Sequence, residues 1–288
     1  MIGGESVQKC DVCFRGCSIE EGNTGACGAR TCTDGRIVAS NYGKITSAAL
    51  DPIEKKPLHD FHPGSMILSV GSYGCNLRCP YCQNSDISWS ERAFEFAGQA
   101  KYYSPEEIVA SAEELKTEGN IGIAFTYNEP LIGYEFVRDT ARLAHEQGLL
   151  NVLVTNGTAN IRVLGEISPY IDAMNIDLKA FSQRFYRDLI KGDLEMVKAF
   201  IEGAAGICHV ELTTLIIPGE NDSPEEMREL ASWVADLEKK AGKTIPLHVT
   251  RFFPRFHMND RAATPVKKVI ELAEVAGEYL SKVYTGNI

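Results

Sequence analysis

Three cysteines lie close together in residues 74–84 (GCNLRCPYCQN), with the spacing Cys-x3-Cys-x2-Cys. Three thiolates on one short loop can ligate three corners of a cuboidal iron–sulfur cluster. The fourth iron then has no protein thiolate and keeps an open position, as a catalytic zinc does. The spacing differs from the paired Cys-x2-Cys units of zinc ribbons. Cys75, Cys79 and Cys82 are therefore predicted to hold a reactive iron–sulfur cluster, with a zinc site or buried unliganded thiols as the alternative.

A second group of cysteines lies near the N-terminus, in a part of the chain rich in Cys and Gly. Cys10, Cys13, Cys17 and Cys27 supply four thiolates, enough for a tetrahedral zinc or an auxiliary iron–sulfur cluster. Zinc is the preferred metal of the two, and free thiols are the alternative. Residues 1–50 show little apolar periodicity, so we predict a small Cys-rich segment there, followed by a core domain over residues 51–288.

The composition limits the class of protein. The chain has 288 residues, with 29 Lys and Arg against 39 Asp and Glu, and a formal net charge of −10. Non-specific nucleic-acid binding needs excess positive charge, so no nucleic-acid partner is expected. No apolar run approaches the about 20 residues of a membrane span, and the first residues lack a signal-peptide core. We therefore expect a cytoplasmic protein without a membrane partner, in which clustered cysteines bind metal rather than form disulfides.

The elements that must position these cysteines alternate along the chain. Short apolar runs predict strands at residues 66–70, 121–126, 151–155, 173–178, 209–217 and 247–252. Helical periodicity and N-terminal capping signals predict helices at residues 104–117, 131–147, 182–190, 194–204, 223–240 and 264–281. Such alternation predicts an α/β fold with a parallel sheet, and six units fit an open barrel better than a doubly wound sheet. The three-cysteine loop follows the first strand, at the end where α/β barrels carry their active sites.

The three-cysteine segment resembles the signature of the radical S-adenosylmethionine (SAM) superfamily. Several other segments resemble the AmmeMemoRadiSam-system radical SAM enzymes, which are often described as similar to pyruvate formate-lyase activating enzyme: residues 10–17 (CDVCFRGC), 51–58 (DPIEKKPL), 126–130 (TYNEP), 175–179 (NIDLK), 213–219 (TTLIIPG) and 284–287 (YTGN). The resemblance implies a partial (βα)6 radical SAM barrel and a 4Fe-4S cluster that binds SAM. It further implies that one electron from the cluster cleaves SAM to methionine and a 5′-deoxyadenosyl radical, which abstracts hydrogen from a substrate.

The resemblance also implies roles for individual residues. Glu129 stands where the superfamily carries Gly-Gly-Glu-Pro and would accept hydrogen bonds from the SAM amino group. Tyr81 would lie against adenine and Lys179 near the SAM carboxylate. Asp177 would be a second SAM contact or the partner of Lys179 in a structural ion pair. The full set of expected cofactor contacts is Tyr81, Asn84, Glu129, Thr155, Asn156, Asp177 and Lys179.

Three functions remain open on the sequence. The first is a radical SAM oxidoreductase acting on an unidentified substrate, with a protein or peptide preferred because a barrel of few strands has a side opening. The second is a glycyl-radical enzyme activase, and the third is a non-catalytic zinc or iron–sulfur scaffold. A ferredoxin or flavodoxin is the expected electron donor of such an enzyme. His248 and Arg251, on the sixth predicted strand, are interpreted either as interior polar groups or as substrate or ribose contacts.

Overall fold

The computed structural model describes residues 7–288, apart from the side chain of Phe96. Its main feature is one sheet of eight strands in the order β14-β13-β12-β11-β10-β9-β7-β6. Neighbouring strands are parallel except at one edge, where β6 pairs antiparallel with β7. The strands are β6 (Ser47–Pro52), β7 (Met66–Gly71), β9 (Asn120–Phe125), β10 (Leu150–Thr155), β11 (Ala173–Asp177), β12 (His209–Ile216), β13 (Leu247–Arg251) and β14 (Val283–Gly286).

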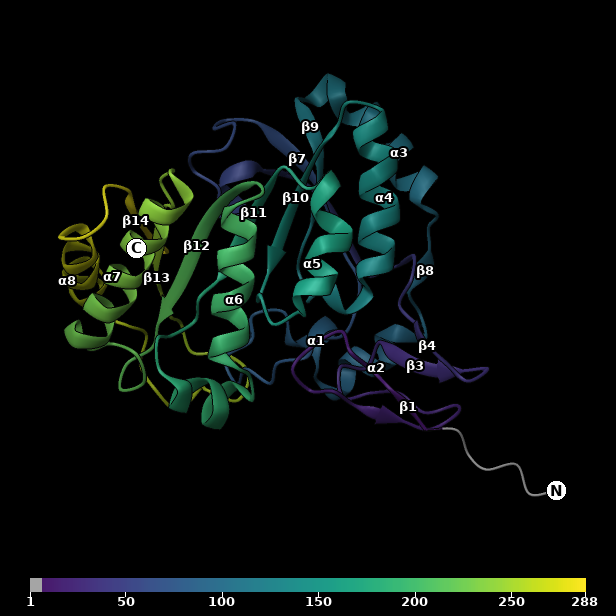
Figure 1. Cartoon of the computed structure of the whole chain (residues 1–288), viewed down its shortest axis with the longest axis horizontal. Helices are drawn as coiled ribbons and strands as arrows, with labels where there is room; N and C mark the ends of the chain where they lie inside the picture. The colour runs from purple at the N-terminus through teal and green to yellow at the C-terminus, as the bar shows by residue number, and fades with distance from the viewer. Residues whose placement is uncertain (1–6) are drawn as a thin grey trace.

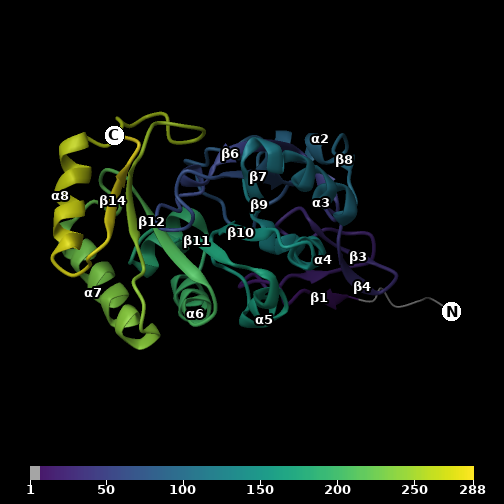
Figure 2. The ribbon, with the colours of Figure 1, turned by 90° about the horizontal axis from the view of Figure 1, so that it is seen from above.

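Helices cover the outer face of this sheet, and the strands follow an arc inside them (Figures 1 and 2). They are α3 (Pro105–Glu114), α4 (Tyr134–Glu146), α5 (Ile161–Ile167), α6 (Leu194–Ala205), α7 (Pro224–Ala241) and α8 (Val266–Gly277). The edge strands β6 and β14 do not pair with each other, so the barrel is open. Shorter helical pieces are α1 (Ser85–Ser88), α2 (Glu91–Ala97), η1 (Ile53–Lys55), η2 (Leu115–Glu118), η3 (Pro130–Gly133), η4 (Ser168–Tyr170) and a π-helix, η5 (Phe185–Ile190).

The predicted α/β fold and parallel sheet are confirmed, and the predicted helix starts have a visible cause. Ser104 caps α3 by accepting from the Glu107 N–H, while the Glu107 carboxylate accepts from the Ser104 N–H, which makes a capping box. Ser223 accepts from the Glu226 N–H in the same way at α7. Both helices begin with proline, whose missing N–H costs nothing at that position.

All six predicted strands are present, with ends within one or two residues of the prediction. The sequence did not predict β6, β14 or α5. The two extra strands are edge strands with mostly half-exposed side chains, so they lack the apolar run of a central strand. Helix α5 has only seven residues, too few for a clear helical period.

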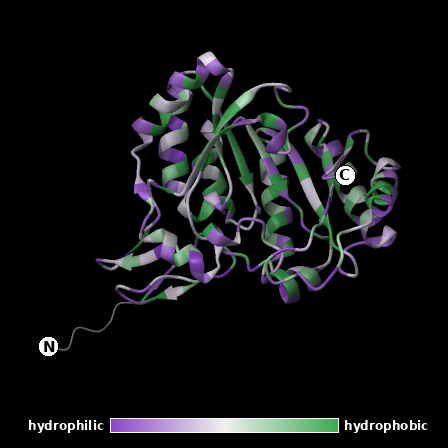
Figure 3. Cartoon of the chain, turned by 180° about the vertical axis from the view of Figure 1, so that it is seen from behind, coloured by the Kyte–Doolittle hydropathy of each residue, from purple (hydrophilic) through white to green (hydrophobic). Residues whose placement is uncertain are grey.

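The core lies between the sheet and its outer helices. The strands of the sheet are largely hydrophobic, as the colouring in Figure 3 shows. The central strands read as continuous apolar runs because both of their faces are covered. Within residues 7–288, no helix is both long enough and apolar enough to cross a membrane.

The N-terminal segment forms small antiparallel pairs and lies at one end of the sheet (Figure 1). The pairs are β1 (Gln8–Lys9) with β2 (Ser18–Ile19), β3 (Arg30–Thr33) with β4 (Arg36–Ala39), and β5 (Lys44–Ile45) with β8 (Lys101–Tyr102). The Asn160 N–H donates to the Val12 carbonyl at 2.8 Å, and Arg30 pairs with Glu135 at 2.7 Å. These contacts attach the segment to the loop after β10 and to α4.

The opposite end of the sheet is filled by a polar network around Glu211 on β12. The Glu211 side chain has no solvent exposure and accepts four hydrogen bonds. Two come from backbone N–H groups of His59 and Asp60, at 3.0 and 2.8 Å. The others join it to the Nε2 atoms of His209 and His248, at 2.9 and 2.6 Å. Glu211 therefore fixes the segment after η1 against the amino ends of the strands.

Candidate active site

The three-cysteine loop leaves the carboxyl end of β7 and turns sharply at Gly74. Gly74 has φ +91°, and a Cβ there would lie 2.7 Å from the Cys27 carbonyl oxygen. Only glycine fits this conformation and this close approach. The Cys75 N–H then donates to the same Cys27 oxygen at 3.1 Å, and the Cys82 N–H donates to the Cys79 carbonyl at 3.2 Å. The turn thus directs three thiols toward the carboxyl ends of the neighbouring strands.

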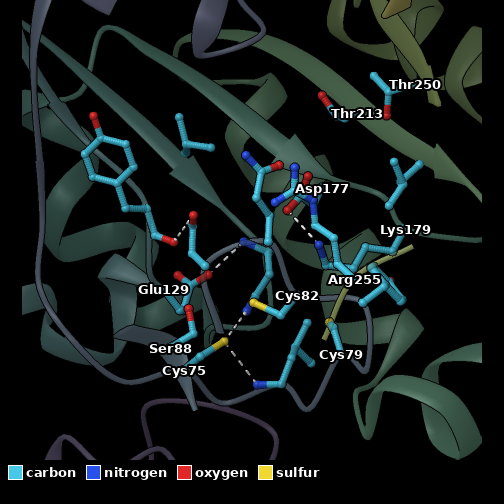
Figure 4. Close-up of a pocket in the computed structure, with 18 of the residues that line it drawn as sticks. Cys75, Cys79, Cys82, Ser88, Glu129, Asp177, Lys179, Thr213, Thr250 and Arg255 are labelled. Atoms are coloured by element: carbon cyan, nitrogen blue, oxygen red, sulfur yellow. Dashed lines mark hydrogen bonds and ion pairs between the residues drawn. The ribbon is translucent and has the colours of Figure 1, made fainter. Parts of the chain in front are cut away.

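These thiols line a cavity of about 470 Å³ at the carboxyl ends of the strands (Figure 4). Such a volume is in the ordinary range of cofactor sites. All ten residues predicted for the cluster and its SAM contacts line this cavity: Cys75, Cys79, Cys82, Tyr81, Asn84, Glu129, Thr155, Asn156, Asp177 and Lys179. They come from the carboxyl ends of four different strands and from the loops that follow, so only the folded sheet brings them together.

The chemistry of the three thiols suits iron. Cys75 Sγ accepts from the Leu77 N–H at 3.4 Å and from Asn156 Nδ2 at 3.8 Å, and such N–H donors favour a thiolate sulfur. Burial raises the pKa of Cys79 to about 12, so a bound metal is needed to displace its proton. No fourth cysteine is among the residues that line the cavity in the described part of the chain. The donor set therefore fits a cluster with one iron left open.

Glu129 lies just after β9 and is 3% exposed. Its carboxylate accepts from Thr155 Oγ1 at 2.7 Å, from the Asn156 N–H at 2.8 Å and from the Leu131 N–H at 3.0 Å. Burial raises the pKa of Glu129 to about 7, although these hydrogen bonds act in the opposite direction. Within the described part of the chain, no positively charged side chain is hydrogen-bonded to Glu129, so its carboxylate is suited to meet a cationic group of a ligand.

Asp177 and Lys179 lie at the carboxyl end of β11 and form an ion pair of 2.7 Å (Figure 4). Burial disfavours the charged ammonium, but the Asp177 carboxylate outweighs this effect and raises the pKa of Lys179 above its usual range. Lys179 is therefore a fixed positive charge at the cavity wall, suited to a carboxylate.

Tyr127 and Asn128 stand where the related pattern has glycines, and the backbone shows why glycine is common there. Tyr127 has φ +72°, a left-handed conformation that costs a non-glycine residue about 1 kcal/mol or more. Its hydroxyl donates to Asp51 at 2.8 Å, and its ring lies 4.8 Å from the Lys56 ammonium. Its carbonyl accepts from Asn84 Nδ2 at 2.7 Å, which ties the cysteine loop to the loop after β9. These contacts hold the strained residue.

Comparisons with known proteins show which family the chain belongs to. The family model "Radical SAM superfamily" matches residues 69–231. An uncharacterized protein of Methanocaldococcus jannaschii is 38% identical over 97% of this chain and 81% of its own length. The chain belongs to the radical SAM superfamily. The pyruvate formate-lyase-activating enzyme of Clostridium pasteurianum is 27% identical over 61% of this chain and 72% of its own length. The crystal structure of Streptococcus suis SuiB bound to precursor peptide SuiA has a TM-score of 0.56 at 11% identity, over 74% of this chain and 46% of that one, which shows a shared fold.

Membership in the radical SAM family confirms the recognition made on the cysteine spacing and supports an enzyme. The family implies a 4Fe-4S cluster and SAM as cofactors. The three thiols, the open cavity beside them and the buried carboxylate fit this pair of groups. Cys75, Cys79 and Cys82 would hold the cluster here.

The structure also adds residues to the cavity wall to which the sequence assigned no role. They include Ser88, Thr213, Thr250, Phe252, Phe253, Arg255 and Asn287. Thr213 and Thr250 lie on β12 and β13, where alternation on an interior strand could have indicated them. Arg255 lies in the irregular segment after β13, and no pattern in the sequence places that segment over the cavity.

The two polar residues noted on the sixth predicted strand have different positions. Arg251 lines the cavity at the carboxyl end of β13. His248 lies toward the amino end of the same strand, where it is bound to Glu211 and its ring lies 4.7 Å from that of His59. Of the two interpretations, His248 is the interior polar group.

The N-terminal cysteines lie outside the main cavity. Cys10, Cys13, Cys17 and Cys27 line a separate small cavity together with Arg30. All nine cysteines are free thiols. Across residues 7–288, no three or more His, Cys, Asp or Glu side chains are grouped to hold a single metal ion. This gives no support to the preference for zinc.

Proposed function

We propose that the protein is a radical SAM enzyme that generates a 5′-deoxyadenosyl radical and uses it to abstract hydrogen from a protein or peptide substrate. One observation carries the proposal: three cysteine thiols, a buried carboxylate and a fixed lysine line a single cavity. When reduced by one electron, the bound cluster would cleave SAM to methionine and the radical. A non-catalytic scaffold has no need of Glu129 and Lys179 at the strand ends.

Each group of the chain has a task in this proposal. Glu129 would hold the SAM ammonium, since its carboxylate is buried and the described hydrogen bonds to it come from neutral N–H and O–H groups. Lys179 would orient the SAM carboxylate from the opposite wall. Tyr81 would pack against adenine; it is 7% exposed and its hydroxyl has no hydrogen-bond partner among the described residues.

The substrate class rests on two points. The sheet is open between β6 and β14, so a cavity at its carboxyl end can be reached from the side. A relative at 27% identity is named as an enzyme that activates pyruvate formate-lyase, a protein. Glycyl-radical activation is for this reason the narrower second candidate, and a ferredoxin or flavodoxin is the proposed electron donor.

The test is anaerobic reconstitution with iron and sulfide, followed by dithionite, SAM and quantification of 5′-deoxyadenosine. We expect product with the wild-type protein and none with Cys79→Ala. Cys208→Ala is the matched control, because Cys208 is also buried but lies outside the cavity. Binding of SAM to the cluster, seen as a change in its electron paramagnetic resonance (EPR) spectrum, should accompany turnover. A fully loaded cluster whose spectrum SAM does not change would refute the proposal.

For the activase candidate, glycyl-radical enzymes from the same source would be incubated with the reconstituted protein, SAM and reductant. A glycyl-radical EPR signal in one of them would establish this narrower function. Formation of 5′-deoxyadenosine without a glycyl signal in any of them would leave the broader proposal standing and reject the narrower one.

A further inference from the structure

The four N-terminal cysteines are brought together by two adjoining loops. Cys10, Cys13 and Cys17 lie in the loop that joins β1 to β2, which is closed by a hydrogen bond of 2.8 Å from the Cys10 N–H to the Cys17 carbonyl. Cys27 comes from the loop before β3. All four line one small cavity, together with apolar walls that include Ile132. The spacing of the first three, Cys-x2-Cys-x3-Cys, is the reverse of that in the cysteine loop after β7.

A residue with an unpaired buried donor lines the same cavity. Arg30 is 5% exposed and lines the cavity with the four thiols. Its Nη1 atom binds the Glu135 carboxylate at 2.7 Å, but its Nε–H has no hydrogen-bond partner among the described residues. A buried donor without an acceptor is costly, and it indicates that the cavity receives a group that accepts hydrogen bonds. A guanidinium also favours an anionic group.

The fifth cysteine of this segment shows that the grouping is selective. Cys32 is fully buried but does not line the cavity, and its thiol donates to Glu21 Oε2 at 3.5 Å. A collection of core thiols would not separate in this way. Of the five cysteines in this segment, four line one cavity, and Cys32 does not.

The arrangement of the four thiols bears on the choice between a zinc ion and an iron–sulfur cluster. A structural zinc needs four sulfurs about 2.3 Å from one point. Within the described residues, no cysteine group converges on a single ion, and this holds equally for Cys75, Cys79 and Cys82. Those three belong to a family that uses a larger cuboidal cluster. Four thiolates that line one cavity can instead ligate such a cluster.

We propose that Cys10, Cys13, Cys17 and Cys27 ligate a second 4Fe-4S cluster. Each thiol loses its proton and becomes a thiolate ligand, and four cysteines leave no open iron. The Arg30 Nε–H would donate to a cluster sulfur, and its charge would offset that of the thiolates. This site is independent of the proposed reaction, because its ligands lie outside the SAM cavity.

The second site would lie directly against the first. The Cys27 carbonyl accepts from the Cys75 N–H, so the two cysteine groups are joined by one hydrogen bond between peptides. Arg78 donates to the carbonyls of Cys75 and Ala26 and is close enough to the thiols of Cys27, Cys75 and Cys79 to interact with them electrostatically. Arg78 therefore adds positive charge between two groups of thiolates.

The test uses the full chain with the first site removed. The variant Cys75→Ala/Cys79→Ala/Cys82→Ala, reconstituted anaerobically with iron and sulfide, should keep about half of the wild-type iron, about four atoms per chain. Mössbauer spectra should show one cluster type. Adding Cys13→Ala and Cys27→Ala should remove this iron, whereas adding Cys32→Ser should not. Thermal unfolding of each variant checks that it is folded.

A second measurement uses the wild-type protein and does not depend on any variant being folded. SAM binds only to an open iron, so it should alter about half of the reduced cluster EPR signal and leave the rest unchanged. The proposal is overturned if the wild type holds only about four irons that all respond to SAM, or if zinc fills the N-terminal site. If the triple variant keeps about four irons while SAM changes no part of the wild-type EPR signal, the proposed radical SAM reaction is refuted and the proposed second cluster is supported.

Discussion

Two buried glutamates, one at each end of the sheet, have opposite electrostatic settings. Glu211 has no exposure, and its hydrogen bonds from His209, His248 and two backbone N–H groups outweigh burial and lower its pKa to about 2. Glu129 is 3% exposed, and burial outweighs its hydrogen bonds and raises its pKa to about 7. Both carboxylates accept hydrogen bonds from the protein, four at Glu211 and three at Glu129.

The difference lies in how completely the protein itself stabilises each charge. Glu211 has two imidazoles and two N–H groups, which leaves no need for a further partner. Glu129 has three neutral donors, and Asp177 nearby raises its pKa further. Glu211 therefore serves the fold, whereas Glu129 is left to be completed by a cation that is not part of the chain. The buried carboxylate at the amino end of the sheet thus stabilises the fold, and the one at the carboxyl end is available to bind a ligand.

The largest expected effect is that of Glu211→Gln, which tests whether Glu211 stabilises the fold. The amide presents an NH2 group to donors that need an acceptor, so we expect a loss of about 3 kcal/mol in the free energy of unfolding. Urea unfolding at pH 7 measures it, with the exposed Glu229→Gln as control. A lowered pKa means that wild-type stability from this group is present above pH 4.5 and is lost as the pH falls from there toward 2. A change below about 0.5 kcal/mol would contradict the structural role of Glu211.

The second test is Glu129→Gln, which should weaken SAM binding on the order of 10- to 100-fold, because a charge-assisted hydrogen bond to the ligand is lost. Calorimetric titration of the reconstituted protein with SAM measures this, and Glu211→Gln, where folded, should bind SAM as the wild type does. The raised pKa has the opposite sign from that of Glu211: it lowers wild-type stability as the pH rises from 4.5 to about 7. Equal SAM affinity in the wild type and Glu129→Gln would show that Glu129 does not contribute to SAM binding.

How far the sequence predicted this arrangement depends on the kind of signal. The cysteine spacing is local, so Cys75, Cys79 and Cys82 could be placed on one loop without any structure. Glu129 and Lys179 could be placed at strand ends because apolar runs define the central strands. That all of them line one cavity follows from the parallel topology, which the alternation of strands and helices predicted.

The remaining features depend on contacts distant in sequence. The role of Glu211 is set by residues 59, 60, 209 and 248, and no local pattern joins these positions. Arg255 enters the cavity wall from an irregular segment, whose course is decided by packing rather than by periodicity. The edge strands β6 and β14 depend on their neighbours for pairing and carry little apolar signal of their own.

A third test concerns the fixed charge on the opposite wall of the cavity. Lys179→Met keeps the length of the side chain but removes its charge, and it should weaken SAM binding by about tenfold. SAM titration gives the affinity, and the exposed Lys267→Met is the control. Unchanged affinity would mean that the pair of Lys179 and Asp177 serves the fold, as Glu211 does.

The smallest expected effect concerns Tyr127 in the loop after β9, and it tests whether this residue stabilises the fold or takes part in SAM binding. Tyr127 lies two residues before Glu129, yet its hydroxyl donates a hydrogen bond to Asp51. Burial alone would raise the pKa of Asp51, but its contacts with Lys56 and Tyr127 lower it to about 2. Tyr127→Phe removes this one hydrogen bond and leaves the Lys56 ion pair of 2.8 Å, so the loss of unfolding free energy should be about 1 kcal/mol. Urea unfolding against the exposed Tyr279→Phe measures it, and SAM titration of the same variant should match the wild type. A clear loss of SAM affinity with unchanged stability would instead assign the Tyr127 hydroxyl to ligand binding rather than to the stability of the fold.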